Sequence, residues 1–218
     1  MRIAVVGASG RTGREVVQQA LSRGHDTLAV ARNPQALTLP DGGTDASGAG
    51  RVRVRGADIL DVKGLGLALE GAEVVVSAVG IGASRHPTDL YSAGTANLLK
   101  AMSSTGARRL AVVSAAPVGP RQDQPMLQRY LAMPILELVF GATYVDMRRM
   151  EALLRDSEVQ WTVLRAPRLI DKSPAGRYRL DDRPLRRGGS VRIPDLAAAL
   201  LDTVSRTDLG RQSLYVAS

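Results

Sequence analysis

The glycines at positions 7, 10 and 13 are the residues whose type and spacing point most clearly to chemistry. They stand in the run GASGRTG, between an apolar segment that ends at Val6 and a segment with helically spaced apolar residues. In such a loop the glycines allow a tight turn, a close approach of the backbone to a pyrophosphate, and close packing of helix on sheet. Amides and the dipole at the helix N-terminus would meet the phosphate charge. We predict a dinucleotide-binding loop rather than a ligand-free turn, with contacts from Gly7, Ser9, Gly10, Arg11, Thr12 and Gly13.

Arg32 follows the second expected strand at the position that distinguishes the two nicotinamide cofactors. Domains that bind NAD usually carry Asp or Glu there, which binds the ribose 2′-hydroxyl. A guanidinium instead matches a 2′-phosphate in charge and in its forked geometry, and Arg11 adds a second cation nearby. The sequence therefore predicts NADPH/NADP over NADH. The alternative is that both arginines are simply solvated, in a chain rich in arginine.

Short apolar runs alternate with amphipathic segments along nearly the whole chain. This alternation is typical of βα units that build a parallel sheet, and 218 residues suit one large domain. We therefore predict an α/β fold, a single Rossmann-fold domain over 1–218 with a doubly wound, mainly parallel sheet. The expected strands are 3–6, 27–31, 51–55, 73–78, 109–114, 160–165 and 213–216, and the expected helices are 14–23, 61–70, 88–105, 144–157 and 194–205.

Three segments do not follow this alternation. Residues 41–50 are rich in small side chains and are expected to form a loop, and about 171–190 are expected to form a hairpin or loop. Residues about 117–141 contain four prolines and are expected to be helical in pieces. Because this last segment follows the fifth strand, it should cover the substrate side. Its apolar residues could then face a flat substrate, or serve ordinary packing or a dimer contact; they include Met126, Leu127, Met133 and Phe140.

The composition excludes several kinds of site. The chain has no cysteine, which excludes disulfides, thiolate catalysis and cysteine metal sites. Two distant histidines, His25 and His86, do not favour a metal site, and none is predicted. The net charge of +8 rests on 29 Lys and Arg residues, of which only three are lysines. Because the arginines are scattered and aromatic residues make up only 3%, no nucleic-acid partner is expected.

We expect neither a secretory leader nor a membrane-spanning segment. The N-terminus goes straight into a strand-like run, and the longest apolar stretch, Leu131–Val139, is far too short to cross a bilayer. We therefore expect a cytoplasmic protein, no membrane partner, a small-molecule acceptor, and a monomer or homodimer.

The order of further motifs resembles that of the atypical short-chain dehydrogenases. The chain is similar to their NAD(P)H-binding, NmrA-like group, and most similar to its biliverdin reductase B / flavin reductase branch, over nearly its whole length. The motifs that carry the resemblance after GASGRTG are Arg32-Asn33, Ala57-Asp58-Ile59-Leu60-Asp61, Ser77-Ala78-Val79-Gly80, Gly94-Thr95-Ala96-Asn97-Leu98 and Leu164-Arg165-Ala166-Pro167-Arg168-Leu169.

The resemblance implies cofactor contacts at the ends of the third and fourth strands. Asp58 and Ile59 would hold the adenine. Ala78, Val79 and Gly80 would pass under the ribose and phosphates on the nicotinamide side. These positions agree with the rule that ligands lie outside the carboxyl ends of parallel strands.

The resemblance also implies residues near the reacting atoms. Ser114 would lie beside the nicotinamide and the substrate, unless its hydroxyl only caps the end of the strand. Pro167 and Arg168 would flank the nicotinamide, and Arg168 could meet an anionic acceptor such as a flavin phosphate.

The pattern departs from the better-known dehydrogenases at the tyrosine. Those enzymes use Tyr-x-x-x-Lys, in which lysine lowers the tyrosine pKa for proton transfer. Here the nearest match is Tyr144 with Arg148, and Tyr130 has Pro134 at the fourth position. Where many relatives of the branch place a lysine, four residues before Glu151, this chain has Met147. Tyr144 stays a candidate catalytic residue, but a packing role or a wall of the substrate site is the favoured interpretation.

An acceptor that needs little acid help would suit a site without a tyrosine base. Flavins and quinones take a hydride and can gain protons from solvent, while the protein supplies orientation and a dry pocket. The sequence thus predicts an NADPH-dependent oxidoreductase acting on a flavin-, quinone- or tetrapyrrole-like acceptor. The alternative is a non-catalytic NmrA-like redox sensor that binds NADP(H) and acts through a protein partner; an epimerase or dehydratase of nucleotide-sugars is a weaker third.

Overall fold

Eight strands form one sheet in the order β3-β2-β1-β4-β5-β6-β10-β8, as seen in the computed structural model. The structure describes all residues except 38–49, 83–85, 125, 127 and 187, so most of the loop expected at 41–50 lies outside the described residues. Every neighbouring pair in the sheet is parallel except β8 and β10. The elements are β1 (Arg2–Val6), α1 (Arg11–Ser22), β2 (Asp26–Ala31), β3 (Val52–Gly56), α2 (Val62–Ala68), β4 (Val74–Ser77), α3 (Leu90–Thr105), β5 (Arg109–Ala115), α4 (Met133–Arg155), β6 (Gln160–Ala166), β7 (Arg168–Ile170), β8 (Arg179–Asp181), β9 (Ser190–Arg192), α5 (Ile193–Ser205) and β10 (Gln212–Ala217).

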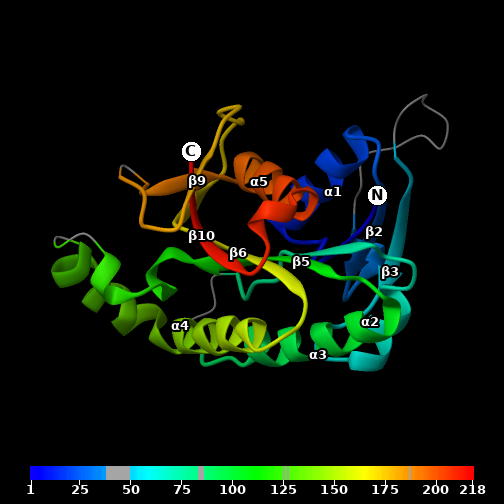
Figure 1. The fold of residues 1–218 in the computed structure, drawn as a ribbon, viewed down its shortest axis with the longest axis horizontal. Helices are drawn as coiled ribbons and strands as arrows, with labels where there is room; N and C mark the ends of the chain where they lie inside the picture. The colour runs from blue at the N-terminus through cyan, green and yellow to red at the C-terminus, as the bar shows by residue number, and fades with distance from the viewer. Residues whose placement is uncertain (38–49, 83–85, 125, 127, 187) are drawn as a thin grey trace.

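Helices cover both faces of the sheet. In Figure 1, α1 and α5 lie on one face and α2, α3 and α4 on the other. Side chains of a strand alternate between faces, and β1 shows this directly. Ile3 and Val5 belong to the core beneath α1 and α5, while Ala4 and Val6 belong to the core beneath the other helices. Because both faces are buried, the parallel strands are almost continuously apolar, as expected for a doubly wound sheet.

The amino end of α3 is held by a carboxylate from another helix. Asp146 of α4 is buried and accepts hydrogen bonds from the amides of Tyr91, at 2.8 Å, and Ser92, at 3.2 Å. These amides would otherwise lack partners within their own helix. The carboxylate thereby fixes α4 against α3 and sets the position of the side chains that α4 presents to the sheet.

The structure corrects two expectations about the irregular segments. Instead of remaining broken up to residue 141, α4 begins at Met133, because Pro134 lies in its first turn, where a proline costs no hydrogen bond. Shorter turns precede it, including a π-helical turn over Gln128–Ala132. Of the hairpin or loop expected at 171–190, the loop agrees with most of the described segment, whereas the hairpin is wrong, since β8 pairs with β10, and β9 pairs with β7 in a second, two-stranded sheet. Strands of three residues carry too little periodicity to be recognised in the sequence.

In the described part of the chain, one helical stretch, which joins the π-helical turn to α4, is long and apolar enough to cross a membrane. It runs over Arg129–Arg155, far beyond the apolar stretch considered in the sequence, and 28% of its most apolar window is buried. Its inner face packs in the core through Tyr144, Met147, Met150 and Leu154. Helices that pack in the core of a protein can have the same length and apolar composition, so these two properties by themselves do not indicate a membrane span.

Candidate active site

Gly7 and Gly13 occupy positions where a side chain would collide with the backbone. Gly7 has a φ of +84°, and a Cβ there would lie 3.0 Å from backbone atoms of Ala78 and Val79. A Cβ on Gly13 would lie only 2.2 Å from the carbonyl oxygen of Gly7. The loop is therefore packed between the end of β4 and the start of α1, as the glycine spacing predicts.

The amides of this loop fall into two groups. Those of Gly7 and Ala8 donate to the carbonyl of Val30 at 3.0 Å, and that of Gly10 donates to Gly7 at 3.0 Å. The first amides of α1 have no intrahelical partner, the preceding residue Gly10 has no side chain to cap them, and no acidic residue lies in the first turn. Free donors combined with the helix dipole suit a phosphate. The cradle thus fits the pyrophosphate of a dinucleotide.

A cleft of about 130 Å³ opens beside the loop, where β1 separates β2 from β4 and the strand order reverses. Ligands of doubly wound sheets bind at this point. The residues of the sequence prediction that line the cleft are Gly7, Ser9, Gly10, Arg32, Ile59, Ala78, Val79 and Gly80. Those that do not line it are Arg11, Thr12, Gly13, Asp58, Ser114 and Pro167.

The far wall of the cleft is formed around Ile59. This side chain is 6% exposed and packs on Gly94 of α3, where a Cβ would lie 3.0 Å from it. Asn97, one turn further along α3, donates to the carbonyl of Ile59 at 3.3 Å. The Asp58 carboxylate accepts from the amide of Leu60 at 2.9 Å, so it shapes the turn after β3. These contacts give the glycine and the asparagine of the motif at 94–98 a structural role in this cleft.

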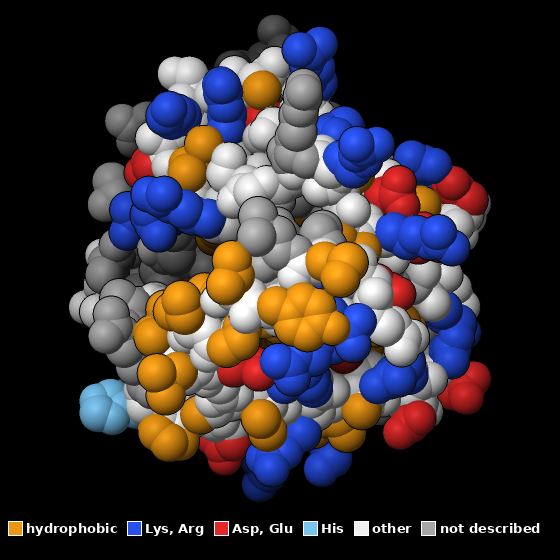
Figure 2. Space-filling view, turned by 90° about the vertical axis from the view of Figure 1, so that its left-hand side faces the viewer, with side chains coloured by type: hydrophobic (Ala, Val, Ile, Leu, Met, Phe, Trp, Pro, Cys, Tyr) orange, Lys and Arg blue, Asp and Glu red, His pale blue; other side chains and the backbone are white. Residues whose placement is uncertain are grey.

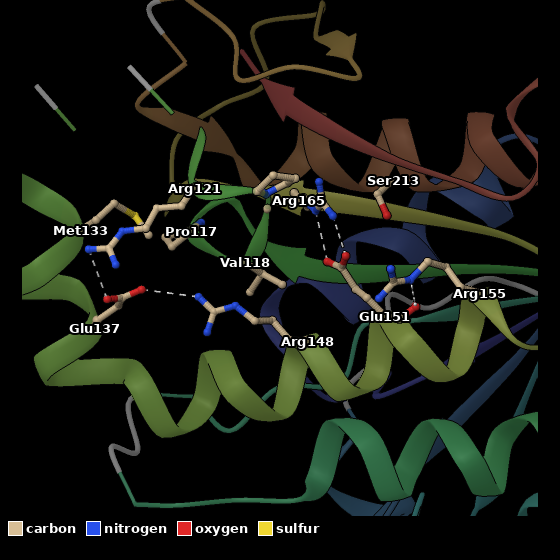
Figure 3. A pocket seen from close by; sticks show the side chains of 12 residues that line it. Pro117, Val118, Arg121, Met133, Glu137, Arg148, Glu151, Arg155, Arg165 and Ser213 are labelled. Carbon is tan, nitrogen blue, oxygen red and sulfur yellow. Dashed lines mark hydrogen bonds and ion pairs between the residues drawn. The ribbon is translucent and has the colours of Figure 1, made fainter. Parts of the chain in front are cut away.

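Ser114, at the carboxyl end of β5, is turned toward α4. Its hydroxyl donates to Glu151 Oε1 at 2.8 Å, and the residue is 2% exposed. Arg165 of β6 donates to the same carboxylate twice, from Nε at 3.2 Å and from a terminal nitrogen at 2.7 Å. Figure 3 shows this pair between α4 and the sheet. The three side chains form a buried network directly beneath the carboxyl ends of the central strands.

The electrostatics of the network are set by Arg165. Burial disfavours its charged form, but hydrogen bonds and the ion pair with Glu151 more than offset this, so the pKa of Arg165 is raised. The guanidinium also lies 5.4 Å from the centre of the Tyr215 ring, within the range of a cation–π contact. Burial raises the pKa of Tyr215, with the nearby Arg165 acting in the opposite sense. Both groups therefore keep their usual protonation states at neutral pH.

A mainly apolar cavity of about 520 Å³ lies at the carboxyl ends of β5 and β6. Tyr144, Pro167 and Arg168 line it, whereas Ser114 does not. The irregular segments 117–141 and 171–190 both contribute to its wall, with residues such as Met133, Phe140, Pro184 and Leu185. Met126 is instead 75% exposed and away from this wall, and Leu127 lies outside the described residues.

Tyr144 has the surroundings of a wall residue. It is 7% exposed, and its ring centre lies 6.1 Å from that of Phe140. Burial raises the pKa of Tyr144, and Arg148 offsets this only in part. Arg148 lies 3.6 Å from Glu137, with which it forms an ion pair. The pair at positions 144 and 148 thus lacks the lowered tyrosine pKa that a Tyr-x-x-x-Lys dehydrogenase requires.

Sequence reasoning did not assign roles to Glu151 and Arg165. An arginine among buried residues of a central strand needs a partner, and this signal was present in the run Thr162–Ala166. Its partner could not be read from the sequence, because the contact depends on how α4 lies across the sheet. Within the described residues, no group of three or more His, Cys, Asp or Glu could hold a metal ion.

The fold and the cleft together define a class, the NAD(P)-binding Rossmann-fold proteins. A family model described as NAD(P)H-binding matches residues 7–207. The chain belongs to this NAD(P)H-binding family.

Two curated relatives are informative. The chain is 35% identical over 140 residues to an uncharacterized protein of Mycobacterium tuberculosis. The matched region covers 64% of this chain but only 14% of that protein. The chain thus spans about a seventh of the length of the first curated relatives. It is also 30% identical over 183 residues to the 3-diazoavenalumate denitrifying reductase of a Streptomyces species, covering 76% of this chain and 55% of that one.

Solved structures share the fold over its whole length. A short-chain dehydrogenase/reductase from Veillonella parvula in complex with NADP has a TM-score of 0.77 and 20% identity, covering 100% of this chain and 94% of that one. An anaerobillin reductase from Escherichia coli O157:H7 has a TM-score of 0.76 and 20% identity, covering 100% and 97%. At this identity the likeness establishes the fold alone.

Proposed function

We propose that this chain is an NADPH-dependent reductase that transfers hydride to a flat, largely apolar acceptor of the flavin, quinone or tetrapyrrole type. The observation that carries the proposal is the apolar cavity of about 520 Å³ at the carboxyl ends of β5 and β6, on the acceptor side of the expected nicotinamide position. We also assign the chain to the biliverdin reductase B / flavin reductase branch, on the motifs that it shares with that branch.

The preference for NADPH rests on Arg32. Its side chain lines the cofactor cleft directly after β2, where a carboxylate would repel a 2′-phosphate and a guanidinium would bind it. Arg11 stands at the exposed start of α1 and does not line the cleft, so we assign it a smaller share. The NADP complex of the Veillonella protein supports the same cofactor.

The nature of the acceptor follows from the groups in the cavity that could donate a proton to it. Tyr144 is buried and stays protonated at neutral pH, and it has no lysine beside it. NADPH would supply the hydride, and the chain would orient the acceptor and exclude water from it. Flavins and quinones suit such a site, because they can take their protons from solvent.

We assign distinct roles to the surrounding residues. Pro167 and Arg168 would flank the nicotinamide from the end of β6, and Tyr144 would form part of the acceptor wall. Ser114 would act through its hydrogen bond to Glu151, as a positioning residue that holds the ends of the paired strands β5 and β6 in place against α4. This role differs from direct contact with substrate, which the orientation of its hydroxyl does not favour.

The proposal is tested by following NADPH oxidation with FMN, riboflavin and menadione, against simple ketones as controls. We expect turnover with the flat acceptors and little or none with the ketones, which need proton donation from a catalytic acid. Faster reduction of a ketone than of any flat acceptor would overturn the proposal.

A second candidate function is a non-catalytic redox sensor that binds NADP(H) and acts through a protein partner. An exposed apolar face favours it. Met126, Tyr130, Leu131, Ile135 and Leu138 are all more than half exposed, around the start of α4. Figure 2 shows hydrophobic side chains gathered on this end of the molecule, bordered by Lys and Arg. Such a face could bind a partner protein. Tight NADPH binding without turnover of any acceptor would favour this candidate.

A further inference from the structure

A second cavity, of about 500 Å³, lies beside the apolar one and is lined largely by charged groups. It is shown in Figure 3, between α4 below and residues of β6, of β10 and of the segment after β5 above. Its charged lining consists of four guanidinium groups and two carboxylates, from Arg121, Arg148, Arg155, Arg165, Glu137 and Glu151. The cavity therefore carries an excess of positive charge.

The two carboxylates are not equally available to these arginines. Glu151 is taken up by Arg165 and Ser114 inside the buried network. Glu137 lies 3.7 Å from Arg121 and 3.6 Å from Arg148, longer than the roughly 2.7–2.9 Å of a charge-assisted hydrogen bond. One carboxylate is thus shared loosely between two guanidinium groups.

Arg155 has even less compensation. Its Nε donates to the backbone carbonyl of Glu151 at 3.3 Å, and among the described residues it makes no ion pair. Figure 3 shows Arg121 above the cavity, and Arg148 and Arg155 on α4 below it. Counting only contacts between described residues, all three guanidinium groups keep donors that could bind an incoming anion. A guanidinium matches phosphate and carboxylate in charge and in its forked geometry.

The arginine-lined cavity adjoins the acceptor cavity, because Pro117, Met133 and Arg165 line both. We propose that it binds a phosphate or carboxylate group carried by the acceptor, whose flat apolar part lies in the neighbouring cavity. The inference rests on the proposed function and deepens it, since it specifies an acceptor with an anionic arm. It also assigns that arm to Arg148 and Arg155 rather than to Arg168, which lines the apolar cavity only.

The test compares FMN with riboflavin, which differ in one phosphate, by flavin fluorescence with the NADP-loaded protein. The variants are Arg148→Gln and Arg155→Gln, with Arg168→Gln for the competing assignment. Arg149→Gln is the matched control, since Arg149 is an exposed neighbour on α4 that does not line the cavity. We expect FMN to bind the wild-type protein more tightly than riboflavin. We expect Arg148→Gln and Arg155→Gln each to weaken FMN binding by about tenfold, the scale of one charge-assisted hydrogen bond.

The remaining outcomes separate the sources of the anion and the two proposals. Riboflavin binding should be the same in Arg148→Gln, Arg155→Gln and the control Arg149→Gln, and inorganic phosphate should compete with FMN but not with riboflavin. Equal affinity for both flavins, no flavin binding, or a loss of FMN affinity only in Arg168→Gln would overturn the inference. So would phosphate binding to the cavity without an effect on FMN, which would indicate a separate anionic effector. Binding as expected without turnover would overturn the proposed reductase but not this site.

Discussion

The hydroxyl of Ser114 and the Oε1 atom of Glu151 are joined by a hydrogen bond of 2.8 Å that links β5 to α4. The same carboxylate accepts hydrogen bonds from Arg165 of β6, so one buried acid connects two central strands to α4. The Glu151 and Arg165 side chains are 7% and 13% exposed. The network therefore ties the carboxyl ends of β5 and β6 to α4.

Removing the acid should destabilise the protein strongly. Glu151→Ala leaves Arg165 charged and buried without its partner, and breaking one side of a buried pair typically costs about 3–5 kcal/mol. Urea unfolding measures the change in the free energy of unfolding. Glu158→Ala, an exposed acid just beyond the same helix, should change it by less than about 0.5 kcal/mol. Equal effects of the two substitutions would refute the role of the network.

Ser114→Ala should affect turnover more than cofactor affinity. The substitution removes one of three hydrogen bonds to Glu151 while leaving its ion pair with Arg165, and Ser114 does not line the cofactor cleft. We expect kcat to fall by roughly tenfold, the scale of one hydrogen bond, with little change in the Kd for NADPH. Steady-state kinetics and equilibrium binding separate the two quantities. An unchanged kcat would remove the positioning role.

Tyr144→Phe should retain most of the activity. If the phenol only forms part of the cavity wall, loss of its hydroxyl leaves the ring packing with Phe140 in place. We expect kcat with FMN within about threefold of the wild-type value. A general acid or base in this position would instead contribute about 10²–10⁴-fold. A loss of that size would show that Tyr144 takes part in proton transfer.

Gly13→Ala should abolish cofactor binding or folding, because the new Cβ would meet the Gly7 carbonyl at 2.2 Å. Gly66→Ala is its control, since a Cβ on this residue of α2 has no heavy atom within 4 Å. Alanine there should be neutral or stabilising by up to about 1 kcal/mol. NADPH titration and thermal unfolding of both variants make the comparison. Normal NADPH affinity in Gly13→Ala would contradict the geometry of the loop.

The protein should lose stability at alkaline pH through tyrosines that are buried or, in the case of Tyr178, half-buried. Burial is the main cause that raises the tyrosine pKa above the ordinary value of 10.0 at four positions, which are Tyr91, Tyr144, Tyr178 and Tyr215. Between the unfolded and folded pKa values the folded state holds more protons, so the free energy of unfolding falls as pH rises. Unfolding midpoints should therefore decrease as the pH rises above about 10. A midpoint independent of pH in this range would contradict the burial of these phenols.

The sequence predicted the sheet and the cofactor loop because both depend on local signals. The glycine spacing around Gly7 and the alternation of apolar runs are local signals of a βα unit. They therefore predict the central strands. The start of α4 was missed because Pro134 reads as a breaker unless it is known to lie in a first turn. The direction of Ser114 and its partner Glu151 could not be predicted, because they depend on the packing of α4 against the sheet.

The central claim is that bound NADPH reduces a flat acceptor on this protein. A single-turnover measurement tests it directly: protein loaded with NADPH is mixed anaerobically with FMN, and the nicotinamide absorbance is followed, with NADH in parallel. We expect rapid loss of NADPH absorbance, and a dissociation constant for NADH that is at least about tenfold higher than that for NADPH, the value of one lost charged contact. Bound NADPH whose absorbance does not change with FMN, riboflavin or menadione would contradict it.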